Sequence, residues 1–299
     1  MRRNRDRLAD RARGAMLGLA VGDALGAPLE WLHPDQIAAR YGGPLRDLVA
    51  SPLWERGEWT DDTAMALALA ESIVDQGGYV EQDVFARYAL WARSGPKDIG
   101  STVDAALRRA RDPSGARSLA ADYHRVTGGQ SAGNGSLMRT VPIALRYLQE
   151  PSGLERFSRL DSGLTHHDPL AGDACVWFNM TVAALVTGRR PPSSRSAVGR
   201  QAAEAAELST AQLADEVQGQ MGYVMTALRV GFAAAFGHDD LEQAIIFAAN
   251  LGGDADTNAA VTGALAGARF GASAIPERWL EPLRERARLT GIATRLLRA

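Results

Sequence analysis

Apolar residues recur at helical spacing along most of the chain, and runs in which apolar and polar residues alternate are almost absent. A period of three to four residues places apolar side chains on one face of an α-helix, whereas strict alternation is typical of a strand. In segment 60–76, Met65, Leu69 and Ile73 lie on one such face, with Thr60 as a cap before two acids. The pattern predicts an all-α fold of about ten helices. They cover segments 8–25, 60–76, 81–91, 103–110, 141–148, 171–187, 197–206, 218–235, 241–251 and 258–270.

The last of these helices is rich in small residues. Gly263, Gly267 and Gly271 follow one another every four positions, and alanines do the same at 260, 264 and 268. A helix without bulky side chains can approach its neighbours closely, so we expect it at the centre of the fold.

The chain has 299 residues, of which 46% are hydrophobic, and this is enough to bury one large core. We therefore expect one compact domain over residues 1–299. Segment 187–196 contains two prolines and several polar residues, which predicts a surface loop rather than a domain boundary.

Charge and composition exclude several classes of partner. Lys and Arg number 33 against 35 Asp and Glu, so the chain lacks the broad basic surface that nucleic-acid binding requires. No run approaches the roughly 20 apolar residues of a membrane span. The arginines at positions 2, 3, 5 and 7 precede an apolar stretch that is too short and too charged at its edges for a signal peptide. With a single cysteine, Cys175, the protein is expected to be cytoplasmic.

Acidic residues are concentrated in two otherwise apolar segments. Residues 59–63 read Trp-Thr-Asp-Asp-Thr, and residues 250–258 read Asn-Leu-Gly-Gly-Asp-Ala-Asp-Thr-Asn. Either segment alone is typical of an acidic helix start. Burying all four carboxylates together would be very costly without cations, and two divalent cations would balance their charge. Their oxygen atoms favour magnesium or manganese, and Gly252 and Gly253 predict a tight turn beside the site.

Other segments place polar groups where they could serve the same site. Glu30 is either a surface acid or a site residue, and Asp98 either caps the next helix or contacts a ligand. Segment 128–139 carries four glycines before an apolar helix, a composition that suits a backbone cradle for phosphate. His166 and His167 are adjacent and point apart on a helix, so a role in holding substrate is favoured over metal ligation.

Together these segments resemble the ADP-ribosylglycohydrolase family, the group of dinitrogenase-reductase-activating glycohydrolase and its relatives. The resemblance implies a single orthogonal helical domain with a binuclear magnesium or manganese centre at the bottom of a cleft. The motifs that carry it occur in the family's order, at residues 14–30, 59–63, 133–139, 165–166 and 252–258.

The resemblance also implies roles for individual residues. Glu30 matches an acid implicated in catalysis in some members, and Asp98 matches a carboxylate that contacts substrate, so both are candidate catalytic residues. The implied metal ligands are Thr60, Asp61, Asp62, Asp254, Asp256 and Thr257. The residues implied to bind ADP-ribose are Gly128, Gly129, Ser131, Gly133, Asn134, Gly135, Ser136, His166 and Tyr223.

The implied activity is metal-dependent removal of ADP-ribose from a modified protein or small molecule, by cleavage at the anomeric carbon of the distal ribose. The metals would orient the ribose and a water, while Glu30 or Asp98 moves the proton. Arginine-linked ADP-ribose is the default, and serine, O-acetyl and nucleic-acid linkages are the alternatives. A two-metal phosphatase or nucleotide hydrolase and a non-catalytic ADP-ribose-binding protein are the rival functions. A monomer is preferred.

Overall fold

The computed structural model describes residues 2–192 and 196–299. Within them the regular structure is helical throughout, apart from an isolated bridge between Gly133 and Tyr223, so the all-α prediction is confirmed. The first helices are α1 (Arg2–Gly26), α2 (Pro34–Tyr41), α3 (Asp61–Gln76), α4 (Glu81–Arg93), α5 (Ser101–Leu107), α6 (Pro113–Val126), α7 (Val141–Arg146) and α8 (Pro151–Ser162). The others are α9 (Pro169–Val186), α10 (Ala197–Glu204), α11 (Thr210–Gly219), α12 (Val224–Gly237), α13 (Leu241–Ala249), α14 (Ala255–Phe270), α15 (Glu277–Leu280) and α16 (Arg286–Leu296). Short 3₁₀ helices are η1 (Ala27–Leu29), η2 (Ala205–Glu207) and η3 (Ala272–Ala274).

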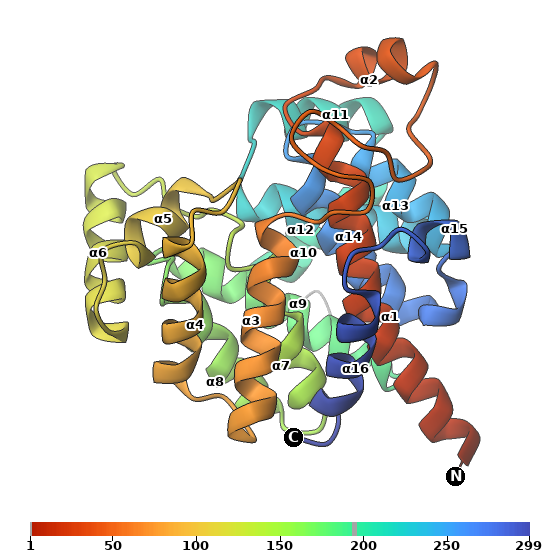
Figure 1. The fold of residues 1–299 in the computed structure, drawn as a ribbon. Coiled ribbons are helices and arrows are strands. Elements are labelled where there is room, and N and C mark those ends of the chain that lie inside the picture. The colour runs from red at the N-terminus through yellow and green to blue at the C-terminus, as the bar shows by residue number, and fades with distance from the viewer. Residues whose placement is uncertain (1, 193–195) are drawn as a thin grey trace.

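Helix α14 lies at the centre of the fold, packed antiparallel against α1 (Figure 1). All of its residues from Ala255 to Ala268 are buried, which confirms the central position predicted for this helix. The two backbones approach closely because α1 carries a glycine at every fourth position of the interface. A Cβ added at Gly18 or Gly22 would lie under 3.0 Å from a carbonyl oxygen of α14.

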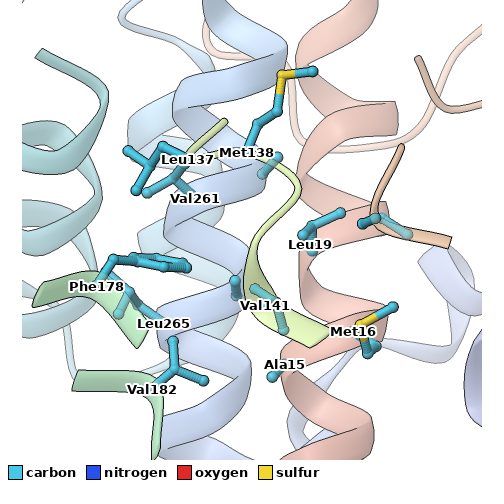
Figure 2. Packing of buried hydrophobic residues seen from close by; sticks show 14 of the residues in the cluster. Ala15, Met16, Leu19, Leu137, Met138, Val141, Phe178, Val182, Val261 and Leu265 are labelled. Carbon is cyan, nitrogen blue, oxygen red and sulfur yellow. The ribbon is translucent and has the colours of Figure 1, made fainter. Parts of the chain in front are cut away.

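One continuous hydrophobic core surrounds this helix pair. Figure 2 shows Met16 and Leu19 of α1 on one side of α14 and Phe178 and Val182 of α9 on the other. Among the described helices, α9 alone has the length and apolar composition of a membrane span without including a bend. However, 72% of it is buried against the other helices, as in the core helix of a globular fold.

The structure contains more helices than the pattern predicted. The helices α2, α6, α8, α11, α15 and α16 were missed because each is short or buries only a narrow apolar stripe. A local signal was present for three of them. Pro34, Pro113 and Pro151 each occupy the first turn of a helix. Proline is tolerated there because backbone N–H groups in the first turn have no partner within the helix.

Two predicted boundaries are wrong for reasons of tertiary structure. The segment 218–235 is broken between α11 and α12, because Gly222 takes a left-handed φ of 74° and the turn bonds to the backbone at Asn134. Helix α14 begins three residues earlier than predicted, so Asp256 lies in its first turn. In the predicted loop 187–196, the part from 188 to 192 is non-helical and at least partly exposed, and residues 193–195 lie outside the described residues.

Candidate active site

A cleft of about 410 Å³ opens where the segment after η1, the starts of α3, α5 and α14, and the turn before α7 come together. It contains most of the residues singled out in the sequence: Glu30, Asp61, Asp98, Gly133, Asn134, Gly135, His166, Asp254, Asp256 and Thr257. The cleft is also lined by residues that had no predicted role, namely Trp31, Ile99, Gly100, Ser101, Thr102, Val103, Met138, Met221 and Gly222.

The first acidic segment is held by a residue that had no predicted role. Thr60 caps α3 as predicted, with its hydroxyl accepting from the amide of Asp62. Asp23, fully buried in α1, accepts hydrogen bonds from the amides of Thr60 and Thr63 at 2.8 and 3.0 Å. It also accepts from the Thr63 hydroxyl at 2.6 Å. Asp23 therefore fixes the start of α3 against α1, and an acid inside an otherwise apolar helix was the sequence signal for it.

The predicted turn at Gly252 and Gly253 orients the second acidic segment, residues 250–258. Gly252 and Gly253 have φ values of 68° and 62°, in the left-handed region that favours glycine. The amide of Gly253 donates to the carbonyl of Leu32 at 2.9 Å, and the amide of Trp31 donates to the carbonyl of Gly253 at 2.7 Å. This pair of bonds fixes the chain after Glu30 against the entrance of α14.

Three carboxylates converge at the centre of the cleft. Ligand oxygens of Glu30, Asp98 and Asp256 all lie within 4.8 Å of one another, although the residues come from three distant segments. Glu30 is thus a cleft residue rather than a surface acid. Asp98 does not cap α5, whose N-cap is Gly100 with no side-chain hydrogen bond.

The remaining acids and threonines form a connected shell around this trio. The hydroxyl of Thr257 donates to Asp62 at 3.3 Å, and the amide of Thr257 donates to Asp256 at 2.9 Å. The side-chain amide of Asn134 donates to Asp254 at 2.7 Å, which ties the glycine-rich segment to the acidic one. Thr60 and Asp62 lie behind the cleft wall rather than on it.

Burial and mutual repulsion make ionisation of these acids unfavourable. Burial, with the charges of Asp98 and Asp254, raises the pKa of Glu30 to about 8. The pKa of Asp61 also rises to about 8, through burial and the charges of Asp98 and Asp23. Burial and neighbouring carboxylates also raise the pKa of Asp256 well above its ordinary value.

This shell fits divalent cations. In the protein alone, the buried Oδ2 of Asp62 has no hydrogen-bond partner, a costly state for a carboxylate oxygen. The surrounding donors are carboxylate and hydroxyl oxygens, the ligands that magnesium and manganese prefer. A bound cation would supply the unpartnered oxygen with a ligand and remove the repulsion that raises these pKa values.

The glycine-rich segment is only partly at the cleft. Gly133 and Gly135 line it, and glycine is needed there because a Cβ at either position would lie within about 3 Å of a neighbouring side chain. Gly128 and Gly129 are exposed at the end of α6, outside the cleft lining.

The two predicted serines point away from the cleft. Ser131 is buried and bonds to His124 at 2.7 Å, and Ser136 is buried and bonds to Ser162 at 2.9 Å. Neither is among the residues that line the cleft.

His166 lines the cleft as a neutral ring. Its burial, with the positive charge of Arg139 nearby, lowers its pKa to about 3. Its Nδ1 bonds to the hydroxyl of Thr165 at 2.8 Å, which fixes the ring. Tyr223 pairs with the backbone of Gly133, and its two preceding neighbours, rather than Tyr223 itself, line the cleft.

The comparisons with known proteins agree with this architecture. A family model described as ADP-ribosylglycohydrolase matches residues 4–299. A solved structure titled ADP-ribosylglycohydrolase-related protein complex superposes with a TM-score of 0.74 at 32% identity, covering 98% of this chain and 99% of that one.

Similar curated proteins span most of the chain. The ADP-ribosyl-dinitrogen reductase glycohydrolase of Rhodospirillum rubrum is 35% identical, over 92% of this chain and 90% of its own. The ADP-ribosylarginine hydrolase Tri1 of Serratia proteamaculans is 32% identical, over 96% and 79%. The human ADP-ribosylhydrolase ARH3 is 25% identical, over 91% and 89%. These matches support the prediction of an enzyme acting on ADP-ribosylated substrates, and they show that the chain belongs to the ADP-ribosylglycohydrolase family.

Proposed function

We propose that the protein hydrolyses the bond between ADP-ribose and a modified acceptor, using two divalent cations, Mg²⁺ or Mn²⁺. The observation that carries this proposal is the convergence of Glu30, Asp98 and Asp256 in the cleft of a chain from this family. Arginine-linked ADP-ribose is the proposed substrate, since the Tri1 relative is named an ADP-ribosylarginine hydrolase.

The proposed cation ligands are the acidic and threonine side chains at the N-termini of α3 and α14. Asp61, Asp254, Asp256 and Thr257 line the cleft, while Thr60 and Asp62, whose unpartnered Oδ2 is the oxygen left for a cation, lie directly behind that wall. When bound, the cations would hold the ribose hydroxyls and a water and would lower the pKa of that water. The chain's own contribution is to keep these ligands in place, through Asp23 at α3 and the glycine turn at α14.

The bond to be broken joins the anomeric carbon to an acceptor atom. A water oxygen bonds to that carbon, the electron pair leaves with the acceptor atom, and one proton moves from the water to the acceptor. Glu30 and Asp98 are the proposed proton carriers, because both carboxyl groups lie in the cleft beside Asp256.

The rest of the cleft would hold ADP-ribose. Gly133 and Gly135 bring the backbone close to the cavity without a side chain, as a diphosphate requires. A neutral His166 offers a hydrogen bond rather than a charge. Polar and apolar groups at one concave site suit a nucleotide-like ligand.

Hydrolysis assays with single variants test this function. Glu30→Gln should lower kcat for ADP-ribosyl-arginine peptide by about 10²–10⁴-fold, the usual contribution of a general acid or base. Asp256→Ala should abolish the dependence of the rate on added Mg²⁺ or Mn²⁺. Asp122→Ala is the matched control, because Asp122 is an exposed carboxylate on α6.

The substrate panel should include arginine, serine, acetyl-ester and DNA-base linkages, together with p-nitrophenyl phosphate. Near-full activity of Asp256→Ala would exclude the metal site proposed here. Release of phosphate from p-nitrophenyl phosphate, with no cleavage of any ADP-ribosyl bond, would favour the phosphatase alternative.

A further inference from the structure

A second cavity, with a volume of about 310 Å³, lies directly beside the cleft. Asp61 and Asp98 line both spaces, so the two share an acidic wall. Three of the chain's six tryptophans, Trp54, Trp59 and Trp91, line the second cavity. We call it the tryptophan cavity, and nothing in the proposed function has used it.

The walls of this cavity are held in place by the tertiary structure. The indole N–H of Trp59 donates to the carbonyl of Arg284 at 3.1 Å, and the amide of Arg284 donates to the carbonyl of Gly57 at 2.9 Å. Glu285, which also lines the cavity, has a φ of 55°, an unfavourable conformation for a residue with a side chain. Trp59 and Trp91 are partly exposed, so their rings are accessible from the cavity.

The charges in the cavity are unevenly distributed. Glu58 is paired with both Lys97 and Arg284, at 2.7 and 2.8 Å, so its charge is compensated. Glu285 is paired with Arg288. Among the described residues no ion pair joins a basic side chain to Asp98, so Asp98, at the wall shared with the cleft, is the carboxylate of this cavity that can face a cationic ligand.

The cavity already holds one cation against an aromatic ring. The ammonium group of Lys97, the chain's single lysine, lies 5.1 Å from the centre of the Trp54 ring. A guanidinium group is a planar, delocalised and weakly hydrated cation, so it stacks on tryptophan and pairs with carboxylates. Serine hydroxyls and acetyl esters carry no positive charge, so they neither stack on tryptophan as cations nor form ion pairs with carboxylates.

We propose that the tryptophan cavity receives the acceptor side of the substrate, as the guanidinium and side chain of an ADP-ribosylated arginine. This inference rests on the proposed function. With ADP-ribose in the cleft and arginine in the tryptophan cavity, the bond to be broken lies at the wall formed by Asp61 and Asp98. Trp91 and Trp59 stack on the arginine side chain, and Asp98 faces its charge.

Selectivity between linkages tests the proposal. For Trp91→Ala, the ratio of kcat/KM for arginine-linked over O-acetyl-linked ADP-ribose should fall by about tenfold, as expected for loss of a cation–aromatic contact in a partly desolvated cavity. Trp91→Phe should restore most of that ratio. Leu90→Ala is the control, because Leu90 precedes Trp91 on α4 but is 73% exposed and outside the cavity.

A measurement on the unaltered protein complements the variants. Agmatine, which carries a guanidinium, should inhibit competitively against arginine-linked substrate and quench tryptophan fluorescence, whereas hexane-1,6-diamine, which has a similar length and charge but no guanidinium, should do neither at the same concentration. Loss of agmatine inhibition in Trp91→Ala but not in Leu90→Ala would support the assignment.

The two proposals fail in different ways. An unchanged linkage ratio in Trp91→Ala, or an equal loss with every substrate, overturns the acceptor site while hydrolysis by the unaltered protein still stands. Equal inhibition by agmatine and hexane-1,6-diamine overturns it as well. If the unaltered protein cleaves no ADP-ribosyl bond with either metal, the proposed function itself fails.

Discussion

Replacing Arg139 by alanine should remove much of the stability of the fold, because this arginine is the centre of a fully buried polar network. Its guanidinium donates to a carboxylate oxygen of Asp161 at 3.0 Å and to the backbone carbonyl of the same residue at 2.9 Å. A third bond, at 3.3 Å, reaches the carbonyl of Gly135 in the cleft wall. Tyr88 donates to the other Asp161 oxygen at 3.0 Å, and its ring lies 4.5 Å from the guanidinium.

The expected loss follows from burial. Both members of the ion pair are almost inaccessible to water, at 0% and 1% side-chain exposure, so Arg139→Ala leaves a buried carboxylate uncompensated. Breaking such a pair costs about 3–5 kcal/mol, a large share of the roughly 5–15 kcal/mol that keeps a domain folded. In the exposed pair Arg125–Asp122, with 74% and 60% side-chain exposure, the same substitution at Arg125 should cost about 0–1 kcal/mol.

Urea unfolding of the metal-free protein, followed by circular dichroism, measures both variants. The double variant Arg139→Met/Asp161→Asn should recover part of the loss, since no uncompensated charge remains. Arg139→Ala should also lower kcat/KM in the folded protein, because Gly135 loses its anchor. If Arg139→Ala cost no more than Arg125→Ala, the reasoning from burial would be refuted.

Three further predictions concern the acidic shell and the helix pair beneath it. In the metal-free folded protein, the pKa values of Glu30 and Asp61 are about 8, above their ordinary values of 4.5 and 3.8. The contribution of these two groups to the free energy of unfolding is therefore present at low pH and is lost as the pH rises toward 8. Saturating Mg²⁺ should remove this dependence of stability on pH in urea titrations. Metal binding at pH 7 should also release protons, which calorimetry in two buffers measures. Asp23→Asn should weaken Mn²⁺ binding by about 10–100-fold, because it loosens the residues that orient the ligands. Gly18→Ala should cost about 1–3 kcal/mol in thermal unfolding, since its Cβ would collide with the carbonyl of Gly263.

Each of these has a matched control. Glu30→Gln should reduce the pH slope of the metal-free protein, leaving the part due to Asp61, and an unchanged slope would contradict the shifted pKa of Glu30. The control for Asp23→Asn is Asp173→Asn, because Asp173 is an exposed carboxylate. Equal Mn²⁺ affinity in these two variants would exclude an orienting role for Asp23. For Gly18→Ala the control is Gly291→Ala in α16, where a Cβ meets nothing within 4 Å. Equal effects at the two glycines would show that close packing of α1 and α14 is not the cause.

Local features of the chain could be predicted because they depend on neighbours in sequence. Helical periodicity indicated the all-α class, Thr60 was identified as the cap of α3, and Gly252 and Gly253 as a tight turn. The segment with glycine and alanine every four residues was correctly placed at the centre, since side-chain volume alone decides how closely a helix can pack.

The composition of the site depended on contacts between distant segments. Nothing in the local pattern shows that Glu30, Asp98 and Asp256 come within 4.8 Å, because that depends on how α1, α5 and α14 pack. The same packing gives Asp23 its role at the start of α3 and moves Ser136 into the interior. The sequence by itself determined which segments are helical and which carry acids. Only the tertiary structure decided which of those acids share one cleft, because their convergence is set by helix packing rather than by spacing along the chain.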